Sequence, residues 1–283
     1  MPLTIPDHRH LLILTAIAHW LAVSLYLSAT GFFFHGLRSG KTKSLKIGFW
    51  LTAAGMFPHT LALGARWLAV GHGPYLQKDE SLSVLAYGTI GMFLFFSAKS
   101  TRLRSIGTVL LPGALIFMTA QLFLPAETGI RPPATFNGIW FAIHVTSIIP
   151  AMGAFFIAIS SSILYLWQEK HPAQQSGKLP SLPVLDACNY KYTGFAFILW
   201  GIMIVAGAAW AEQSWGSYWS WDAIENWSLI TWLLLGLLLH LRRFHGWQGK
   251  KAAWLMVACF SISILTLFFL PVLTGSIHKE YLL

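Results

Sequence analysis

Tryptophan is the first residue type in this chain whose pattern could serve chemistry. Six of the 14 tryptophans lie between Trp210 and Trp232. Indole offers a flat apolar face and one N–H donor, so a dense group of indoles suits a large flat ligand. The alternative is an interfacial belt of aromatic residues, and the density of this stretch exceeds what such belts contain. We therefore predict that Trp215, Trp219 and Trp221 form a ligand platform.

The residues after this platform predict how it is held. Asp222 is followed three residues later by Glu225 and then by an apolar run from Leu229, which is the pattern of a helix start capped by Asp222. We expect Trp227 and Trp232 to support the platform from the first turns of that helix.

Histidine is the second such residue type, with 11 in the chain. Polar residues at membrane depth are functional candidates, and imidazole is a standard axial ligand of haem iron. His144 and His278 each fall at the same predicted membrane face as the tryptophans, so we expect both to ligate one haem. His240 lies near the other face and predicts a second, inner ligand. Its mate would be His35, His59 or a residue of another protein.

The composition requires a membrane setting for these residues. The chain has 283 residues, of which 55% are hydrophobic and 10% charged, whereas soluble domains carry about 25% charged residues. We predict an all-α polytopic membrane helix bundle with about eight transmembrane helices and both termini on the outer (periplasmic) side. The predicted spans are 11–35, 45–70, 81–98, 105–124, 136–167, 192–210, 226–242 and 252–275.

The basic residues predict the orientation of the bundle in the inner, cytoplasmic membrane. Of the 19 lysines and arginines, 14 fall on one set of alternate loops, which the positive-inside rule places in the cytoplasm. This bias accounts for most of the net charge of +9, so we expect no nucleic-acid partner. The tryptophan-rich loop then lies outside. We predict one integral domain over 1–283, with 210–227 as its external loop.

The stretch WGSYWSWDAIENWSLITW, followed by LLLHLR, resembles the WWD signature of haem-handling proteins in cytochrome c maturation. More specifically, it resembles the CcsA/ResC type of the System II synthase. FAIHVTSIIPAMGAFFIA and TGSIHKEY resemble the family segments that bear the two outer histidines, and GHGPYLQKDESL resembles the loop before the third helix. The resemblance spans most of the chain.

The resemblance implies a function for these residues. The family holds haem b, as substrate or transient ligand, at the outer face between two histidines over the WWD platform. His144 and His278 would take those roles, and His240 the transmembrane one. A CcsB/ResB-type partner brings apocytochrome c, and its CxxCH cysteines join the haem vinyl groups. The chain would then be part of a holocytochrome c synthase, and its task would be positioning, with no acid–base catalytic residue expected.

Two features depart from the family pattern, and other functions compete with it. Where members commonly read WDPKE, this chain has Ala223 and Ile224 between the two acids, and the partner portion fused in some members is absent.

A CcmC-type protein would hand haem to a chaperone, but six helices are expected there. A b-type dihaem electron-transfer subunit would need paired histidines such as His59 and His240, and would leave the tryptophan loop unexplained. A HemX-like regulatory protein should lack the full loop.

Overall fold

The computed structural model describes residues 8–120, 123, 132–171 and 180–273, with side chains as far as residue 264. The described chain is helical throughout, with no strand in these residues. Its eight α-helices are α1 (Arg9–Ser39), α2 (Thr42–Val70), α3 (Lys78–Ser97), α4 (Gly107–Ala120), α5 (Ile139–Lys170), α6 (Leu182–Trp215), α7 (Ala223–His245) and α8 (Lys250–Leu273). Two short 3-10 helices, η1 (Leu103–Ile106) and η3 (Ala134–Asn137), precede α4 and α5.

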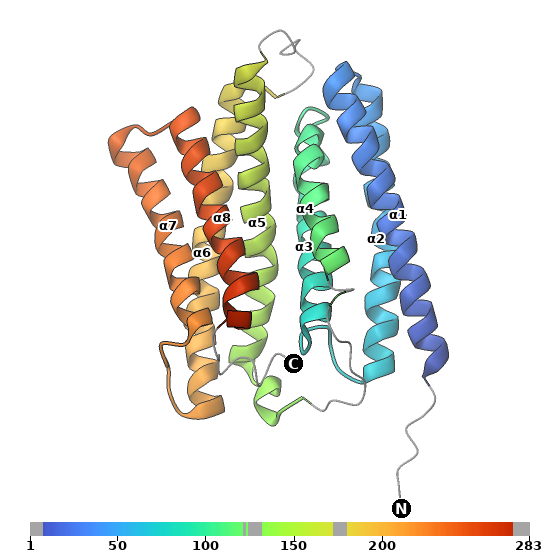
Figure 1. Cartoon of the computed structure of the whole chain (residues 1–283), viewed down its shortest axis with the longest axis vertical. Helices are drawn as coiled ribbons and strands as arrows, with labels where there is room; N and C mark the ends of the chain where they lie inside the picture. Colours follow the sequence, from blue (N-terminus) through green and yellow to red (C-terminus); the bar gives the residue numbers. More distant parts are fainter. Residues whose placement is uncertain (1–7, 121–122, 124–131, 172–179, 274–283) are drawn as a thin grey trace, which may run out of the picture.

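The helices run alternately up and down in one bundle, so that α1 begins and α8 ends at the same end (Figure 1). The α1–α2 pair lies at one side and α7 at the other. Helix α5 is central: it packs against α3, α4, α6 and α8. Every residue from Ala151 to Ser162 on α5 is buried, so this part of α5 forms the centre of the core.

Six of these elements are long and apolar enough to cross a membrane, judged by length and composition within the described residues. They are Arg9–Ser39, Lys78–Ser97, Leu103–Ala120, Ile139–Lys170, Leu182–Trp215 and Ala223–His245. The predicted all-α membrane bundle is therefore confirmed. Helices α2 and α8 correspond to the second and eighth predicted spans and complete the set of eight, although they are not among these six.

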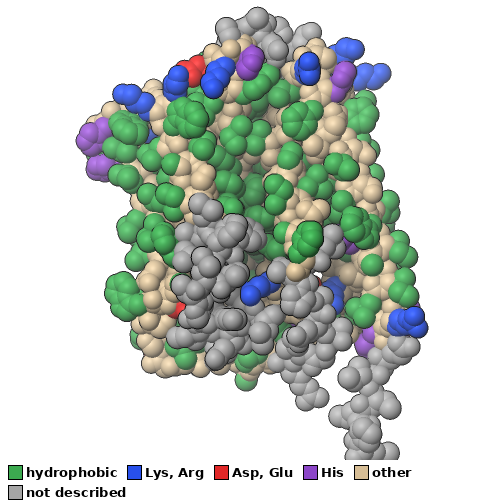
Figure 2. Space-filling view, viewed as in Figure 1, with side chains coloured by type: hydrophobic (Ala, Val, Ile, Leu, Met, Phe, Trp, Pro, Cys, Tyr) green, Lys and Arg blue, Asp and Glu red, His purple; other side chains and the backbone are tan. Residues whose placement is uncertain are grey.

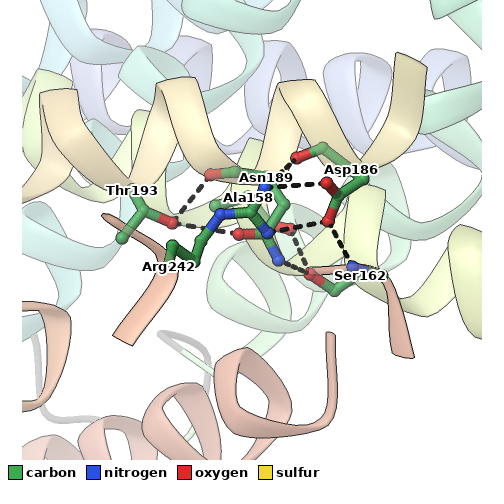
Figure 3. A network of polar contacts seen from close by, with 7 residues as sticks. Ala158, Ser162, Asp186, Asn189, Thr193 and Arg242 are labelled. Atoms are coloured by element: carbon green, nitrogen blue, oxygen red, sulfur yellow. Dashed lines mark hydrogen bonds and ion pairs between the residues drawn. The ribbon is translucent and has the colours of Figure 1, made fainter. Parts of the chain in front are cut away.

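Helix α6 begins at Leu182, well before the predicted start at 192. The first turns of α6 are less hydrophobic because they contain Asp186, Asn189 and Lys191. The apolar run therefore begins later in the sequence than the helix does. The structure shows how two of these polar residues are accommodated. Asp186 accepts two hydrogen bonds from the Arg242 guanidinium of α7, both at 2.7 Å, and one from the Gly249 N–H at 2.9 Å (Figure 3).

A second polar group extends this network into the bundle. The Asn189 amide donates to the Ser162 hydroxyl of α5, and the Thr193 hydroxyl donates to the Asn189 carbonyl at 2.7 Å (Figure 3). Buried polar groups are costly unless they are hydrogen-bonded, and these are. The network therefore joins α5, α6, α7 and the α7–α8 turn at one end of the bundle.

That end is also where lysine and arginine side chains gather, as Figure 2 shows along its upper edge. We call it the basic end. The opposite end, where α6 ends and α7 begins, carries the tryptophan-rich loop, and we call it the tryptophan end. The predicted separation of basic loops from the tryptophan loop is thus present in the fold.

Candidate functional site

The loop between α6 and α7 is held by the first turn of α7. The Glu225 carboxylate accepts hydrogen bonds from the Ser220 N–H at 2.8 Å, the Ser220 hydroxyl at 3.0 Å and the Asp222 N–H at 3.2 Å. Asp222 in turn accepts from the Ile224 N–H at 2.9 Å, so that the two acids form the predicted capping box. At the other end of the loop, Gly216 caps α6 in the left-handed conformation that glycine favours.

Trp221 adopts a conformation that tryptophan rarely takes. Its φ is +59°, in the left-handed region, and it is the one non-glycine residue with positive φ in the described chain. The Asn226 side-chain amide donates to the Trp221 carbonyl at 2.7 Å and so helps to hold this conformation. Strained residues of this kind persist where the surroundings fix them, commonly at functional sites. The consequence here is that the Trp221 indole points outward and is 73% exposed.

A cavity of about 200 Å³ lies under the loop. Its walls come from α3, α5, α6, α7 and the loop itself, and most of them are apolar or aromatic. The polar exceptions are His144, Glu225 and Ser228, together with the hydroxyl of Tyr218. The aromatic walls are Trp200, Trp210, Tyr218 and Trp219. Such a cavity, with few polar groups, is the usual form of a site for a flat apolar ligand.

A smaller cavity of about 150 Å³ adjoins it and shares Leu85, His144, Ile148 and Trp210 as walls. Its other walls include Tyr75, Phe136 and Phe141. His144 therefore stands at the boundary between two cavities at the tryptophan end.

The His144 imidazole is oriented by the backbone of α6. Its Nδ1 lies 2.9 Å from the Met203 carbonyl oxygen. A carbonyl oxygen can only accept, so Nδ1 carries the hydrogen and Nε2 carries the lone pair of the neutral ring. Second-shell hydrogen bonds of this kind fix the tautomer of metal-binding histidines. The Trp210 indole lies nearly parallel to the ring, with centroids 6.0 Å apart at 23°.

Gly207 makes this close approach of α5 and α6 possible. A Cβ at Gly207 would lie 2.6 Å from His144 Nδ1 and 2.9 Å from Cε1. Any side chain there would push the imidazole away from Met203. The sequence gives no sign of this pairing, because His144 and Met203 are 59 residues apart.

The three tryptophans of the predicted platform lie in different surroundings in the structure. Trp219 lines the larger cavity, but Trp221 faces outward and contacts Trp219 edge-on, with ring centroids 6.1 Å apart. Trp215 packs instead against Trp210, at 5.5 Å and 75°, beside the aromatic cluster that includes Phe136 and Phe141. One of the three predicted platform residues therefore lines the cavity in this structure.

The two supporting tryptophans also differ. Trp227 lines a third, small cavity of about 50 Å³, which shares Trp200 and Ser228 with the main one. Trp232 stacks on Phe197, with centroids 4.9 Å apart at 6°, and donates to its carbonyl at 3.0 Å. Trp232 is thus a packing residue between α6 and α7. The sequence analysis did not predict Trp200 and Tyr218 as cavity walls, because no spacing in the sequence sets them apart from the other aromatic residues.

His240 lies at the basic end, far from this site in the fold. It is exposed and lines an open groove between α6 and α7, together with Lys191, Arg243 and Phe244. Arg242, two residues further along α7, forms an ion pair with Asp186 and lies over the Tyr190 ring.

The predicted intrachain mates of His240 lie across the bundle. His35 is on α1 and His59 on α2, at the side of the bundle opposite α7 (Figure 1). His59 is buried, with its ring nitrogens 3.3 Å from the Tyr26 hydroxyl and 3.2 Å from the Ser83 hydroxyl. The expectation that either could join His240 within one chain is therefore wrong. The same separation removes the histidine pair that a dihaem electron-transfer subunit would need. His278 lies outside the described residues.

Comparison with known proteins identifies the family. The family model described as "Cytochrome C assembly protein" matches residues 75–278, which include the loop and the cavity residues named above. The chain belongs to the cytochrome c assembly protein family.

Curated relatives named cytochrome c biogenesis protein CcsA narrow this family further. The protein of Guillardia theta is 30% identical over 275 residues, covering 89% of this chain and 86% of the relative. That of Chlamydomonas reinhardtii is 35% identical over 199 residues, covering 68% of this chain and 56% of the relative. The CcsA-type resemblance is thus confirmed.

A solved structure of the cytochrome c haem lyase CcmF has the same fold. It superposes with a TM-score of 0.70 at 16% identity, over 91% of this chain and 46% of CcmF. Membership of the cytochrome c assembly family, as a multi-pass membrane protein, supports a role in cytochrome c maturation.

Proposed function

We propose that this chain binds haem at the tryptophan end and presents it to apocytochrome c for covalent attachment, as one subunit of a System II cytochrome c synthase. The observation that carries the proposal is His144: its imidazole is fixed through Nδ1, and its lone-pair nitrogen belongs to a ring that lines an aromatic cavity. Haem is flat and largely apolar, and its iron takes imidazole ligands. The cavity residues therefore fit the substrate.

Each residue has a distinct part in this function. His144 and His278 are the axial ligands of the outer haem. Trp219 faces the porphyrin from within the cavity, Trp221 contacts Trp219 from the outer side of the loop, and Trp215 supports Trp210 from the end of α6. Asp222 and Glu225 fix the loop on α7.

The chemistry needed from the chain is positioning. A cysteine thiol of CxxCH adds across a haem vinyl group: a carbon–sulfur bond forms, and the thiol hydrogen ends on the other vinyl carbon. The thiolate supplies the nucleophile and the haem the electrophile. Holding both in a reactive geometry is the contribution that a rigid pair of helices can make. In this function the tryptophan end faces the outside of the cytoplasmic membrane.

His240 is proposed as the ligand of a second haem or of a haem in transit. Its exposed position in an open groove supports a mate supplied by another chain, such as a CcsB/ResB-type subunit. This second site explains why an imidazole lies on the outer surface of α7 at membrane depth.

The test is to change His144 to Gly and measure haem content, the visible spectrum and cytochrome c maturation with the partner co-expressed. Haem occupancy and maturation should fall, and added imidazole should restore both in part by filling the vacant position. His171→Gly is a matched control, since His171 caps the C-terminus of the same helix and its Nδ1 contacts the Trp167 carbonyl at 2.8 Å, but at the basic end. A low-spin spectrum and full maturation without imidazole would remove His144 from the site.

The same co-expression separates the CcmC-type alternative. A synthase subunit should yield holocytochrome when given a CcsB/ResB-type partner and an apocytochrome. A haem delivery protein should instead require a haem chaperone, and its haem should appear on that chaperone.

A further inference from the structure

One groove at the basic end is lined by basic residues and by no acidic residue of the described chain. It lies between α6 and α7 and has a volume of about 550 Å³. Its basic walls are Lys191 of α6 and Arg243 of α7, and the exposed His240 also lines it. Figure 2 shows basic and histidine side chains next to hydrophobic ones where α7 ends. The groove is therefore a positively charged surface at one end of the bundle.

The carboxylates at this end of the bundle are engaged elsewhere. Among the described residues they are Glu169, near the end of α5, and Asp186, in the second turn of α6. Glu169 pairs with Lys250 at 3.4 Å, and Asp186 pairs with Arg242 at 2.7 Å. Neither ion pair includes a basic residue of the groove. The groove therefore keeps a positive charge that an anion from outside the chain can neutralise.

The helix dipole accounts for one of the two cations but not for the other. Arg243 lies in the last turn of α7, where the dipole favours a positive charge. Lys191 is instead the tenth residue of α6, about 13 Å along the axis from the start of that helix. An ionisable side chain within an apolar helix is costly and marks a candidate binding site.

The surroundings of the Lys191 ammonium leave its donors available. The ammonium lies 5.9 Å from the Tyr192 ring centre and 6.0 Å from that of Phe195, at the outer limit of a cation–π contact. Such contacts use no N–H···O bond, whereas an ammonium has three donors. An oxyanion in the groove would supply the acceptors that these donors need.

The remaining walls of the groove are mostly apolar or aromatic. Leu239 and Phe244 come from α7, and Tyr190 and Gly194 come from α6. Phe244 is 70% exposed, so an apolar surface lies next to the two cations. This combination suits a ligand with an anionic head and an apolar body. Basic pockets between transmembrane helices bind the phosphate head groups of anionic lipids in this way.

We propose that this groove binds an anionic phospholipid, with Lys191 and Arg243 as partners of its phosphate and its acyl chains along Leu239 and Phe244. A phosphate has several acceptor oxygens and can therefore bind an ammonium and a guanidinium together. The proposal concerns this chain alone and does not depend on the function proposed above. Haem also carries carboxylates on an apolar body, so this lipid would have to leave before a haem in transit reached His240.

The test is a lipid titration of the purified full chain in detergent, followed by native mass spectrometry. Phosphatidylglycerol carries a net negative charge, whereas phosphatidylcholine carries the same phosphate with a compensating cation. The wild-type chain should bind its first phosphatidylglycerol more tightly than its first phosphatidylcholine. The double variant Lys191→Gln with Arg243→Gln should bind phosphatidylglycerol about 30-fold more weakly, which corresponds to about 1 kcal/mol for each of the two cations.

The matched control is the double variant Arg38→Gln with Lys43→Gln. It removes the same two charges from the basic end, but from exposed positions at the turn between α1 and α2. Its affinity for phosphatidylglycerol should equal that of the wild type. An equal loss in both double variants would show that only the overall surface charge matters, and an unchanged affinity in the groove variant would show that the groove is not the site. Either result overturns the proposal.

A second measurement uses the wild-type chain and decides the matter if the groove variant does not fold. Phosphatidylglycerol with a photoreactive diazirine near the head-group end of one acyl chain is bound and illuminated. The crosslinks should fall on residues 190–194 and 239–244. Crosslinks that spare both segments would overturn the proposal.

Inorganic phosphate separates a lipid site from a site for the free anion. It offers the same oxygens but has no apolar body, so it should leave the crosslinks in the groove unchanged at concentrations far above that of the lipid. If it removes them, the groove is a site for free phosphate and the assignment to a lipid fails.

Discussion

At the scale of single residues, the site depends on where each indole points, which residue type alone does not determine. Trp219 lines the cavity, Trp221 faces outward and Trp215 packs into a neighbouring cluster. The backbone differs among the three positions: Trp215 is the last residue of α6, and Trp221 has a left-handed conformation with φ +59°. A sequence pattern shows that the tryptophans are close, but it does not show these differences.

Alanine changes at these three tryptophans should therefore have unequal effects. Trp219→Ala should weaken haem binding most, because it removes a cavity wall. Trp215→Ala should act mainly on stability, by removing an aromatic contact worth about 0.5–1.5 kcal/mol beyond its buried area. Haem titration and thermal unfolding of the same variants would separate the two effects. Equal haem affinity for Trp219→Ala and wild type would show that the cavity is not the haem site.

The conformation of Trp221 gives a second prediction at this scale. Asn226→Ala removes the amide that donates to the Trp221 carbonyl. The left-handed conformation should then relax, since a non-glycine residue there costs about 1–3 kcal/mol. We expect faster proteolysis at the loop and slower cytochrome maturation, with the helical circular dichroism unchanged. Asn226→Asp keeps the acceptor oxygen but loses the donor, so it should resemble Asn226→Ala.

At the scale of elements, the first turn of α7 is the part that fixes the loop. Glu225 accepts three hydrogen bonds from Ser220 and Asp222. Glu225→Gln keeps the shape but leaves one acceptor oxygen for these donors. Hydrogen bonds to charged groups contribute about 1.5–3 kcal/mol, so the loop should loosen and haem dissociate faster. Glu169→Gln is the control, because its partner Lys250 is at the basic end. Equal haem dissociation rates in the two variants would contradict this role of Glu225.

At the basic end, the Asp186–Arg242 ion pair holds α6 and α7 together, and we call it the Asp186–Arg242 lock. Arg242→Leu leaves the Asp186 carboxylate in a largely buried position without its charge partner, which typically costs about 3–5 kcal/mol. The double variant Asp186→Leu with Arg242→Leu should recover much of that loss. Thermal unfolding in detergent would measure both. A single variant as stable as wild type would show that the pair contributes little to the bundle.

The sequence predicted the elements better than it predicted their packing. Apolar runs located all eight helices, and the Asp222–Glu225 pattern located the start of α7. The start of α6 was wrong because hydropathy does not reveal that Asp186 has a partner 56 residues away. The intrachain mates predicted for His240 were wrong because a helix sequence does not say which neighbouring helix each face meets. His144 could be predicted as a candidate, whereas Met203 and Gly207, which orient it, could not.

At the scale of the whole molecule, the bundle separates two functions between its ends. The tryptophan end holds the cavities and His144, and the basic end holds the Asp186–Arg242 lock and the groove of His240. A synthase needs its haem on the side where apocytochrome c arrives, so the orientation in the membrane is a condition of the proposed function. The distribution of basic residues in the loops predicts that orientation.

The orientation can be tested directly. Because 14 of 19 basic residues fall on one set of alternate loops, the positive-inside rule predicts that the basic end lies in the cytoplasm. Reporter fusions after Lys43, Ser176 and Gly249 should therefore report cytoplasm, and fusions after Ser217 and Leu283 the outside. Gly249 and Ser217 are the decisive pair, since α7 alone separates them. A cytoplasmic report at Ser217 would place the cavity on the side away from apocytochrome c, and the proposed function would fail even if His144 binds haem.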